Sequence, residues 1–311
     1  MPVSARTSSR IARTRRLRVV AMLCLGMTSL PALSAPACPH AADARTALSA
    51  MKMVPSPPAD PAGRLDTAMA LIACLGDADP ALRDGVAYTT LARWLRSGAY
   101  TPAELRDLRG QLYALLDGPA GAGYAHPFAA LVLSEVARTD RIAPWMDADE
   151  RTAMVRRASA YLESVDDDRS FDPAEGWRHG VAHGADWLMQ LALHPALQQR
   201  DAARMLDAIA AQAVPARAHA YVAGEPGRLA RPVLFLAQTR PQSVEAWGDW
   251  FAALPPRVGD PALAYADRDW LARRHDLGAF LQALYVMADQ SEDADVRALL
   301  PGIVGALKTL P

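Results

Sequence analysis

The stretch GWRHGVAHGADWL, residues 176–188, carries the most ordered pattern of the chain. His179, His183 and Asp186 are spaced i, i+4 and i+7, so they share one face of an α-helix with 3.6 residues per turn. Histidine and aspartate bind metals, transfer protons or form buried polar networks. The sequence therefore predicts a helix whose polar face is the main candidate functional site.

Glycines recur every fourth residue on the same predicted helix, at Gly176, Gly180 and Gly184. A glycine inside a helix costs about 1 kcal/mol relative to alanine. Three of them on one face indicate that another backbone passes close by. The helix is expected to begin at residues 172–175, where Asp, Pro, Ala and Glu follow the pattern of a capping box, and to end near 195.

Helical patterns follow one another along the chain, and no segment shows convincing two-residue alternation. Further helices are expected near 62–75, 80–98, 101–118, 127–139, from 147 onward, 199–213, 228–238, 242–253, 262–288 with a break, and 293–309. Helices of this length joined by short turns predict an all-α fold of stacked antiparallel helix pairs. Either a superhelical, HEAT-like array or a closed α/α ring fits this pattern.

Residues 1–37 have the features of an export signal. An arginine-rich start precedes an apolar stretch, Val19–Leu33, and small residues follow at Ala35 and Ala37. The apolar stretch is too short and too interrupted for a membrane span, and the mature chain offers no transmembrane segment. The expected organisation is a signal peptide over 1–37, an irregular entry segment over 38–64 and a single all-helical domain over 65–311.

Two cysteines, Cys38 and Cys74, remain in the mature chain. In an oxidising compartment the simplest arrangement is a disulfide between them, which ties the start of the mature chain to an early helix. The alternative is a lipid anchor on Cys38, which directly follows the small residues of the signal. The preceding Ala-Pro-Ala lacks the leucine usual before a lipid-modified cysteine, so a disulfide-bonded periplasmic protein is preferred.

The charge balance argues against several classes of partner. Removing residues 1–37, which hold six arginines and no acidic residue, leaves 27 Lys and Arg against 34 Asp and Glu, a balance of −7. This balance argues against binding to nucleic acids or to anionic lipid surfaces. The chain also lacks a nucleophile elbow, a phosphate-binding glycine loop, a dinucleotide fingerprint and a calcium loop.

Metal binding is one interpretation of the histidine face. His179 and His183, one helical turn apart, could bind a zinc ion, with Asp186 as a third ligand or as a hydrogen-bonding support. The residue types that could supply a further ligand from elsewhere occur at His126, His275 and Asp276. The alternatives are a functional site without metal and, favoured, buried structural histidines that bond to neighbouring helices.

The acidic run before the predicted helix offers a weaker candidate site. Residues 166–169 read Asp-Asp-Asp-Arg and include Asp168. Paired carboxylates in a cleft can act as acid and base on a sugar, and Tyr161, Trp177 and Trp187 could stack on its ring. A solvated turn is the more common role of such a run, and it is the interpretation favoured here.

Several segments resemble, in the same order, a family of bacterial proteins known as domain of unknown function twenty-seven eighty-five. The resemblance covers roughly residues 65–290, and its specific part is the pattern Gly-Trp-x-His-x-x-Ala-His-Gly-Ala-Asp. The flanking matches are Tyr161-Leu162-Glu163, Asp168-Arg169-Ser170-Phe171 and Phe280-Leu281-x-Ala283-Leu284-Tyr285. The resemblance implies an all-helical array without an established activity, with His179, His183 and Asp186 as signature residues of unassigned role.

Together these patterns lead to the expectation of an exported helical array that binds a protein, peptide or glycan in the cell envelope, since such arrays mainly offer concave surfaces to partners. The alternative is an enzyme, either metal-dependent through His179, His183 and Asp186 or active on glycans in a helical ring. A pocket that joins these residues to His126 or His275 would favour the enzyme. Buried, hydrogen-bonded histidines would favour the binding module.

Overall fold

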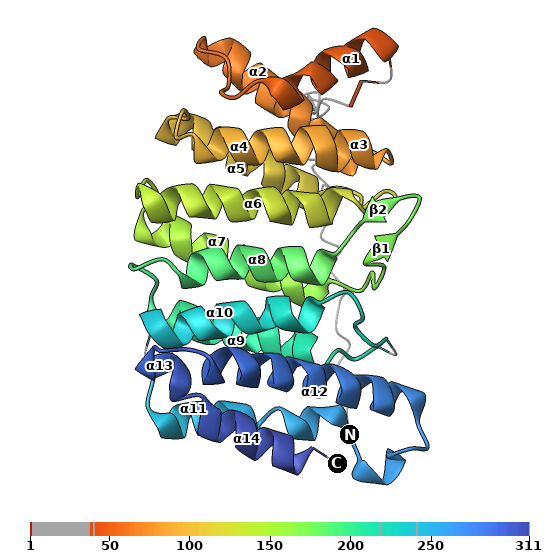
Figure 1. The fold of residues 1–311 in the computed structure, drawn as a ribbon, viewed down its shortest axis with the longest axis vertical. Helices are drawn as coiled ribbons and strands as arrows, with labels where there is room; N and C mark the ends of the chain where they lie inside the picture. Colours follow the sequence, from red (N-terminus) through yellow and green to blue (C-terminus); the bar gives the residue numbers. More distant parts are fainter. Residues whose placement is uncertain (2–37, 40, 218, 241, 311) are drawn as a thin grey trace. The chain divides into compact units, whose positions relative to one another are not determined.

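Nearly all of the regular secondary structure among the described residues is helical (Figure 1). The computed structural model describes residues 1, 38–39, 41–217, 219–240 and 242–310, so the expected signal peptide falls almost entirely outside the described residues. The α-helices are α1 Ala42–Ala50, α2 Pro61–Ala73, α3 Pro80–Leu82, α4 Thr89–Arg96, α5 Pro102–Asp117, α6 Ala125–Ile142, α7 Ala148–Ser164, α8 Gly180–Ala192, α9 Gln199–Ala213, α10 Glu225–Thr239, α11 Val244–Ala252, α12 Arg268–Asp289, α13 Ala294–Arg297 and α14 Leu300–Thr309. The other elements are the short helical turns η1 Met51–Met53, η2 Cys74–Gly76, η3 Arg83–Tyr88, η4 Pro255–Val258 and η5 Pro261–Leu263, and the strands β1 Phe171–Asp172 and β2 Gly176–Trp177.

The helices stack in two layers. In one layer α4, α6, α8, α10 and α12 lie side by side, and each packs against the next (Figure 1). In the second layer α5, α7 and α9 pack on α6, α8 and α10. Within the part of the chain that is described, α2 and α14 lie at opposite ends of the stack, so the helix pairs form an open array and not a closed ring. The prediction of an all-α fold of stacked helix pairs is confirmed.

Local sequence signals explain where several helices begin. Thr101 and Glu104 form a capping box at the start of α5, and Asp147 and Glu150 form another at the start of α7. The side chain of Asp267 accepts a hydrogen bond of 2.7 Å from the backbone N–H of Trp270 and starts α12. Each cap supplies an acceptor to an N–H group that the helix itself leaves unsatisfied.

Of two expectations about the secondary structure, one is wrong and one is found. The entry segment 38–64 is not irregular throughout, because the alanine-rich stretch Ala42–Ala50 forms α1, as the high helix propensity of alanine favours. The helical stretch expected over 262–288 with a break is found as the short turn η5 and the long helix α12, with the break at residues 264–267.

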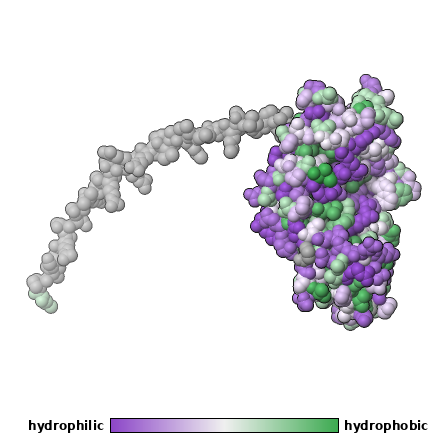
Figure 2. Space-filling view, turned by 60° about the vertical axis from the view of Figure 1, so that its left-hand side comes forward, coloured by the Kyte–Doolittle hydropathy of each residue, from purple (hydrophilic) through white to green (hydrophobic). Residues whose placement is uncertain are grey.

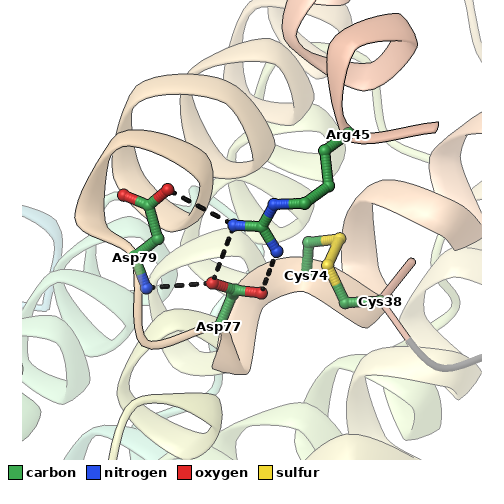
Figure 3. The surroundings of a disulfide bond; sticks show 5 residues. All are labelled: Cys38, Arg45, Cys74, Asp77 and Asp79. Carbon is green, nitrogen blue, oxygen red and sulfur yellow. Dashed lines mark hydrogen bonds and ion pairs between the residues drawn. A yellow bond between two sulfur atoms is a disulfide. The ribbon is translucent and has the colours of Figure 1, made fainter. Parts of the chain in front are cut away.

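A disulfide joins Cys38 to Cys74, as expected (Figure 3). The side chain of Cys74 is fully buried. Beside the disulfide, Arg45 of α1 bonds to Asp77 at 3.0 Å and to Asp79 at 3.3 Å. In the chain-entropy model a disulfide closing a loop of this length contributes about 4 kcal/mol at most. The disulfide and the ion pairs together fix α1 on the array.

The core runs through the array between the two layers. Four tryptophans, Trp94, Trp187, Trp247 and Trp270, are among its largest fully buried side chains.

On the face shown in Figure 2, hydrophilic surface surrounds separate hydrophobic areas. Among the described helices none combines the length and the apolar character needed to cross a bilayer.

Gly180 and Gly184 lie where α8 packs closely on α7. A Cβ atom at Gly180 would lie 3.1 Å from Cγ1 of Val165, and one at Gly184 would lie 3.1 Å from Cε1 of Tyr161. The close neighbour expected for these two glycines is therefore present, but it consists of side chains and not of backbone. Gly176 lies outside the helix, in β2, with φ 77°.

Replacing Gly184 by leucine should lower the free energy of unfolding by more than about 1 kcal/mol, because the added side chain overpacks the contact with α7. Gly110 is the matched control, since it is exposed in α5 and a Cβ there would meet nothing within 4 Å. Gly110→Leu should raise stability by up to about 1 kcal/mol through helix propensity. Urea unfolding measures both changes, and a stabilised Gly184→Leu variant would contradict the packing argument.

Candidate functional site

A β-hairpin precedes α8 where the sequence predicts the first turn of a helix. Oδ1 of Asp172 accepts hydrogen bonds from the N–H groups of Ala174 at 2.8 Å and Glu175 at 3.0 Å, which closes the turn between β1 and β2. The capping box expected at 172–175 is therefore wrong. An aspartate that accepts bonds from the next residues stabilises a tight turn as well as a helix start, and Gly176 with its positive φ directs the chain out of the helical path.

Two buried arginines hold the hairpin against the array. Arg83 donates from Nη2 to the carbonyl oxygen of Glu175 at 2.7 Å, and Arg178 donates to the Glu175 carboxylate at 2.8 Å. The two guanidinium groups lie 3.9 Å and 4.3 Å from the centre of the Tyr124 ring. Cation–π contacts of this kind strengthen when they are removed from water. The position of the hairpin is therefore set by charged groups inside the protein.

His179 connects the hairpin to α8 in a left-handed backbone conformation, with φ 57° and ψ 39°. Among the described non-glycine residues only Tyr265 also has a positive φ. This conformation costs an ordinary residue about 1–2 kcal/mol. Because His179 precedes α8, it does not share a helical face with His183 and Asp186, and that part of the spacing prediction is wrong.

The imidazole of His179 is packed but lacks a hydrogen bond at one nitrogen. Its ring stacks on Trp177 with the ring centres 4.6 Å apart. Nε2 is buried without a hydrogen-bond partner among the described residues, and Oε1 of the buried Glu225 lies 3.7 Å away, beyond hydrogen-bond range. Burial lowers the pKa of His179 below its ordinary value, against the opposing effect of Glu225.

His183 is a buried neutral histidine that links two helices. Its Nδ1 donates a hydrogen bond of 3.1 Å to the carbonyl oxygen of Pro127 in α6, and its ring contacts the edge of Phe128. Burial, together with the nearby His179 and Arg228, lowers the pKa of His183 to about 3. The imidazole therefore stays uncharged at neutral pH and serves the packing of α8 on α6.

Asp186 forms an ion pair with an arginine of α10, the neighbouring helix in the same layer. Nε of Arg228 in α10 donates to Oδ1 of Asp186 at 2.8 Å, and a second contact joins Nη2 to Oδ2. The rings of His179 and His183 have their centres 5.8 Å apart. In the described part of the chain no three His, Cys, Asp or Glu side chains are grouped so that they could hold a metal ion. The three signature residues thus have different main partners, although the rings of His179 and His183 also neighbour each other.

The weaker candidates lie in different parts of the molecule. His126 bonds to the carbonyl oxygen of Gly118 at 2.9 Å, and Asp168 pairs with Arg217. Asp276 is buried and accepts a hydrogen bond of 2.7 Å from the backbone of Tyr221, and burial raises its pKa to about 6. The last candidate, His275, is exposed and lines a shallow pocket beside His219. No described contact joins His126 or His275 to the His183 site.

Sequence reasoning missed Arg83, Arg178, Glu225 and Arg228. Arg178 stands inside the signature stretch, but the chain has almost no lysine, so single arginines carry little signal. Glu225 and Arg228 are three residues apart, a spacing that places them on one side of a helix. That spacing was the available signal, and it could not show which neighbouring helix they face.

Replacing His183 by alanine should lower the free energy of unfolding at pH 7 by about 1–3 kcal/mol, because the Pro127 carbonyl loses its side-chain donor. The difference should shrink as the pH falls. An unfolded histidine binds a proton below its ordinary pKa, whereas folded His183 does so only near its pKa of about 3. The wild type therefore loses up to about 1.4 kcal/mol per pH unit from this group below pH 6.5.

Urea unfolding of both proteins at pH 7, 6 and 5 checks this expectation, and His275→Ala, at an exposed histidine, is the control. A difference independent of pH, or a His183→Ala variant as stable as the wild type at pH 7, would count against a structural role for the ring.

Comparison with known proteins places this site within a family. No curated protein matches the chain, and no solved structure matches it. The family model described as protein of unknown function, DUF2785, matches residues 120–286, which is more than half of the chain and includes the hairpin and α8. The chain therefore belongs to the DUF2785 family of proteins of unknown function.

Proposed function

We propose that this chain is an exported binding module of the cell envelope and that the β1–β2 hairpin contacts a protein partner. The observation that carries the proposal is an exposed pair of aromatic rings. Phe171 is 56% exposed and Trp177 39% exposed, and their ring centres lie 4.9 Å apart. Aromatic side chains of this kind are the usual anchors of protein interfaces.

The surroundings of the pair support a recognition surface. The hairpin is held by the buried Arg83 and Arg178, so Phe171 and Trp177 are presented in a fixed position. Val222, 82% exposed, lies in the segment before α10, next to Ala223, whose backbone interacts with His179. A rigid presentation lowers the entropy lost when a partner binds.

The burial of the signature histidines also supports a binding module over an enzyme. His183 and Asp186 are engaged with Pro127 and Arg228 inside the array. A catalytic acid or base has to lie within hydrogen-bond reach of its substrate. The exposed side chains near α8 are instead the aromatic rings of the hairpin, Phe171 and Trp177.

Export rests on the arginine-rich, then apolar, then small-residue pattern of residues 1–37 and is supported by the disulfide. Cys38 and Cys74 are positioned to bond, and disulfides persist mainly in oxidising compartments. The acidic balance of the mature chain fits a protein that does not bind nucleic acid.

Full-length protein produced in a Gram-negative host should be recovered from the periplasm without residues 1–35 or 1–37. Its intact mass should also show two hydrogens fewer than the dithiol, since Cys38 and Cys74 are bonded. A periplasmic protein that keeps residues 1–33, a cytoplasmic location, or an acyl chain on Cys38 would contradict this form of export.

A photo-crosslinking amino acid at position 171 should give a specific adduct with a protein in the native cell envelope. Position 286 is the control, because Val286 in α12 is also apolar and 50% exposed. Trp177→Ala should reduce the adduct at position 171, while circular dichroism should show unchanged helix content. No adduct at 171, equal adducts at both positions, or an adduct that contains only glycan would overturn the proposed partner class.

A further inference from the structure

A small cavity lies on the side of α8 where Gly180 meets α7. It is enclosed by the loop before α6, the first turn of α6, the end of α7 and the first residue of α8. Its volume is about 90 Å³, which is room for about three water molecules or a molecule of about five non-hydrogen atoms. The polar side chains that line it include His126, Tyr161, Ser164, Asp166 and Arg178.

Arg178 forms the inner, buried part of this cavity, and its side chain is only 5% exposed. Nε donates to the carbonyl oxygen of Ala122 at 3.2 Å and Nη2 donates to Glu175 at 2.8 Å. Among the described residues Nη1 has no acceptor. Gly180 begins α8, and the N-terminal end of a helix carries a partial positive charge. The inner end of the cavity therefore favours a negatively charged group.

Asp166 forms part of the outer rim with the opposite charge. It is exposed, and no group in the described ranges pairs with it. The neighbouring Asp167 already accepts three hydrogen bonds from Arg169, one from its backbone N–H and two from its guanidinium group. The hydroxyl of Ser164 donates to the carbonyl oxygen of Tyr161 at 2.9 Å. The rim therefore offers one free carboxylate to a positively charged group.

Gly123 lets the wall of the cavity close around these groups. It has φ 90°, and a Cβ atom there would lie 2.6 Å from Oδ2 of Asp167 and 2.8 Å from Nη2 of Arg169. A residue with a side chain at position 123 would clash with this ion pair, so only glycine fits there. The ion pair is thereby held against the backbone at the mouth of the cavity.

We propose that this cavity binds a small zwitterion, a free α-amino acid with little or no side chain. Its carboxylate would accept hydrogen bonds from Arg178 at the inner end, and its ammonium group would pair with Asp166 at the rim. The size of the cavity and the presence of both a positive and a negative side chain in its lining favour such a molecule. The site is independent of the hairpin surface and does not rest on the proposed partner.

Titration with glycine, followed by ¹H–¹⁵N spectra, tests the proposal at the site itself. The amide signals of Gly123 and Gly180 should shift in a saturable way. Methylammonium and acetate, which each carry one of the two charges, should bind about tenfold more weakly or worse, because each loses one charge-assisted contact.

Asp166→Asn should weaken glycine binding by about tenfold, since it removes the charge at the rim. Asp249→Asn, at an exposed aspartate of α11, is the matched control and should leave the affinity unchanged. No shift at tens of millimolar glycine would overturn the proposal. Equal binding of acetate with no effect of Asp166→Asn would overturn it too, because the site would then bind only anions.

Discussion

The burial of Arg83 is the constraint on which the arrangement around α8 depends. Its side chain is completely buried, and a guanidinium group stays charged at any physiological pH. A buried charge without partners would cost several kcal/mol. Arg83 donates from Nη1 to the carbonyl oxygen of Asp77 at 2.9 Å and from Nη2 to that of Glu175 at 2.7 Å, two residues far apart in the sequence. Its Nε is buried without a hydrogen-bond partner among the described residues. The hairpin thus supplies a hydrogen-bond acceptor to a buried charge that lies near the start of the array.

Aromatic and imidazole rings connect this hairpin to the interior. Phe171, Trp177, His179, His183 and Phe128 form a row of neighbouring rings from the surface to the core, with successive ring centres 4.6–5.8 Å apart. Exposure decreases along the row, from the open Phe171 to the buried Phe128. The histidines of the signature fit here as uncharged members of a packed row, because burial lowers the pKa of both.

The sequence predicts the parts of this structure that depend on local physics. The helices that start after Thr101 and Asp147, the all-α class and the pairing of Cys38 with Cys74 are found as expected. The sequence does not predict the hairpin because Asp172 offers the same acceptor to a turn as to a helix. The turn is supported by the positive φ of Gly176 and by Arg83, about ninety positions away, which bonds to the carbonyl oxygen of Glu175.

The candidate site shows the same division. The stretch from Gly176 to Asp186 lies within the residues that the family model matches. The sequence does not predict the roles of these residues, because each one bonds to a residue on a different helix. His183 bonds to Pro127, and Asp186 bonds to Arg228. Spacing along one helix fixes which residues share a face, whereas partners on other helices decide what that face does.

The left-handed backbone at His179 also bears on which side chains position 179 can accept. Glycine and asparagine adopt this conformation readily, so either would relieve the backbone while removing the ring that covers one face of Trp177. An aliphatic residue would keep the strain and lose the stacking. The left-handed backbone at position 179 favours glycine or asparagine, whereas the contact with Trp177 favours a ring. Histidine keeps the contact with Trp177. In a related protein, the residue at position 179 would therefore show whether the stacking on the tryptophan of the hairpin is kept.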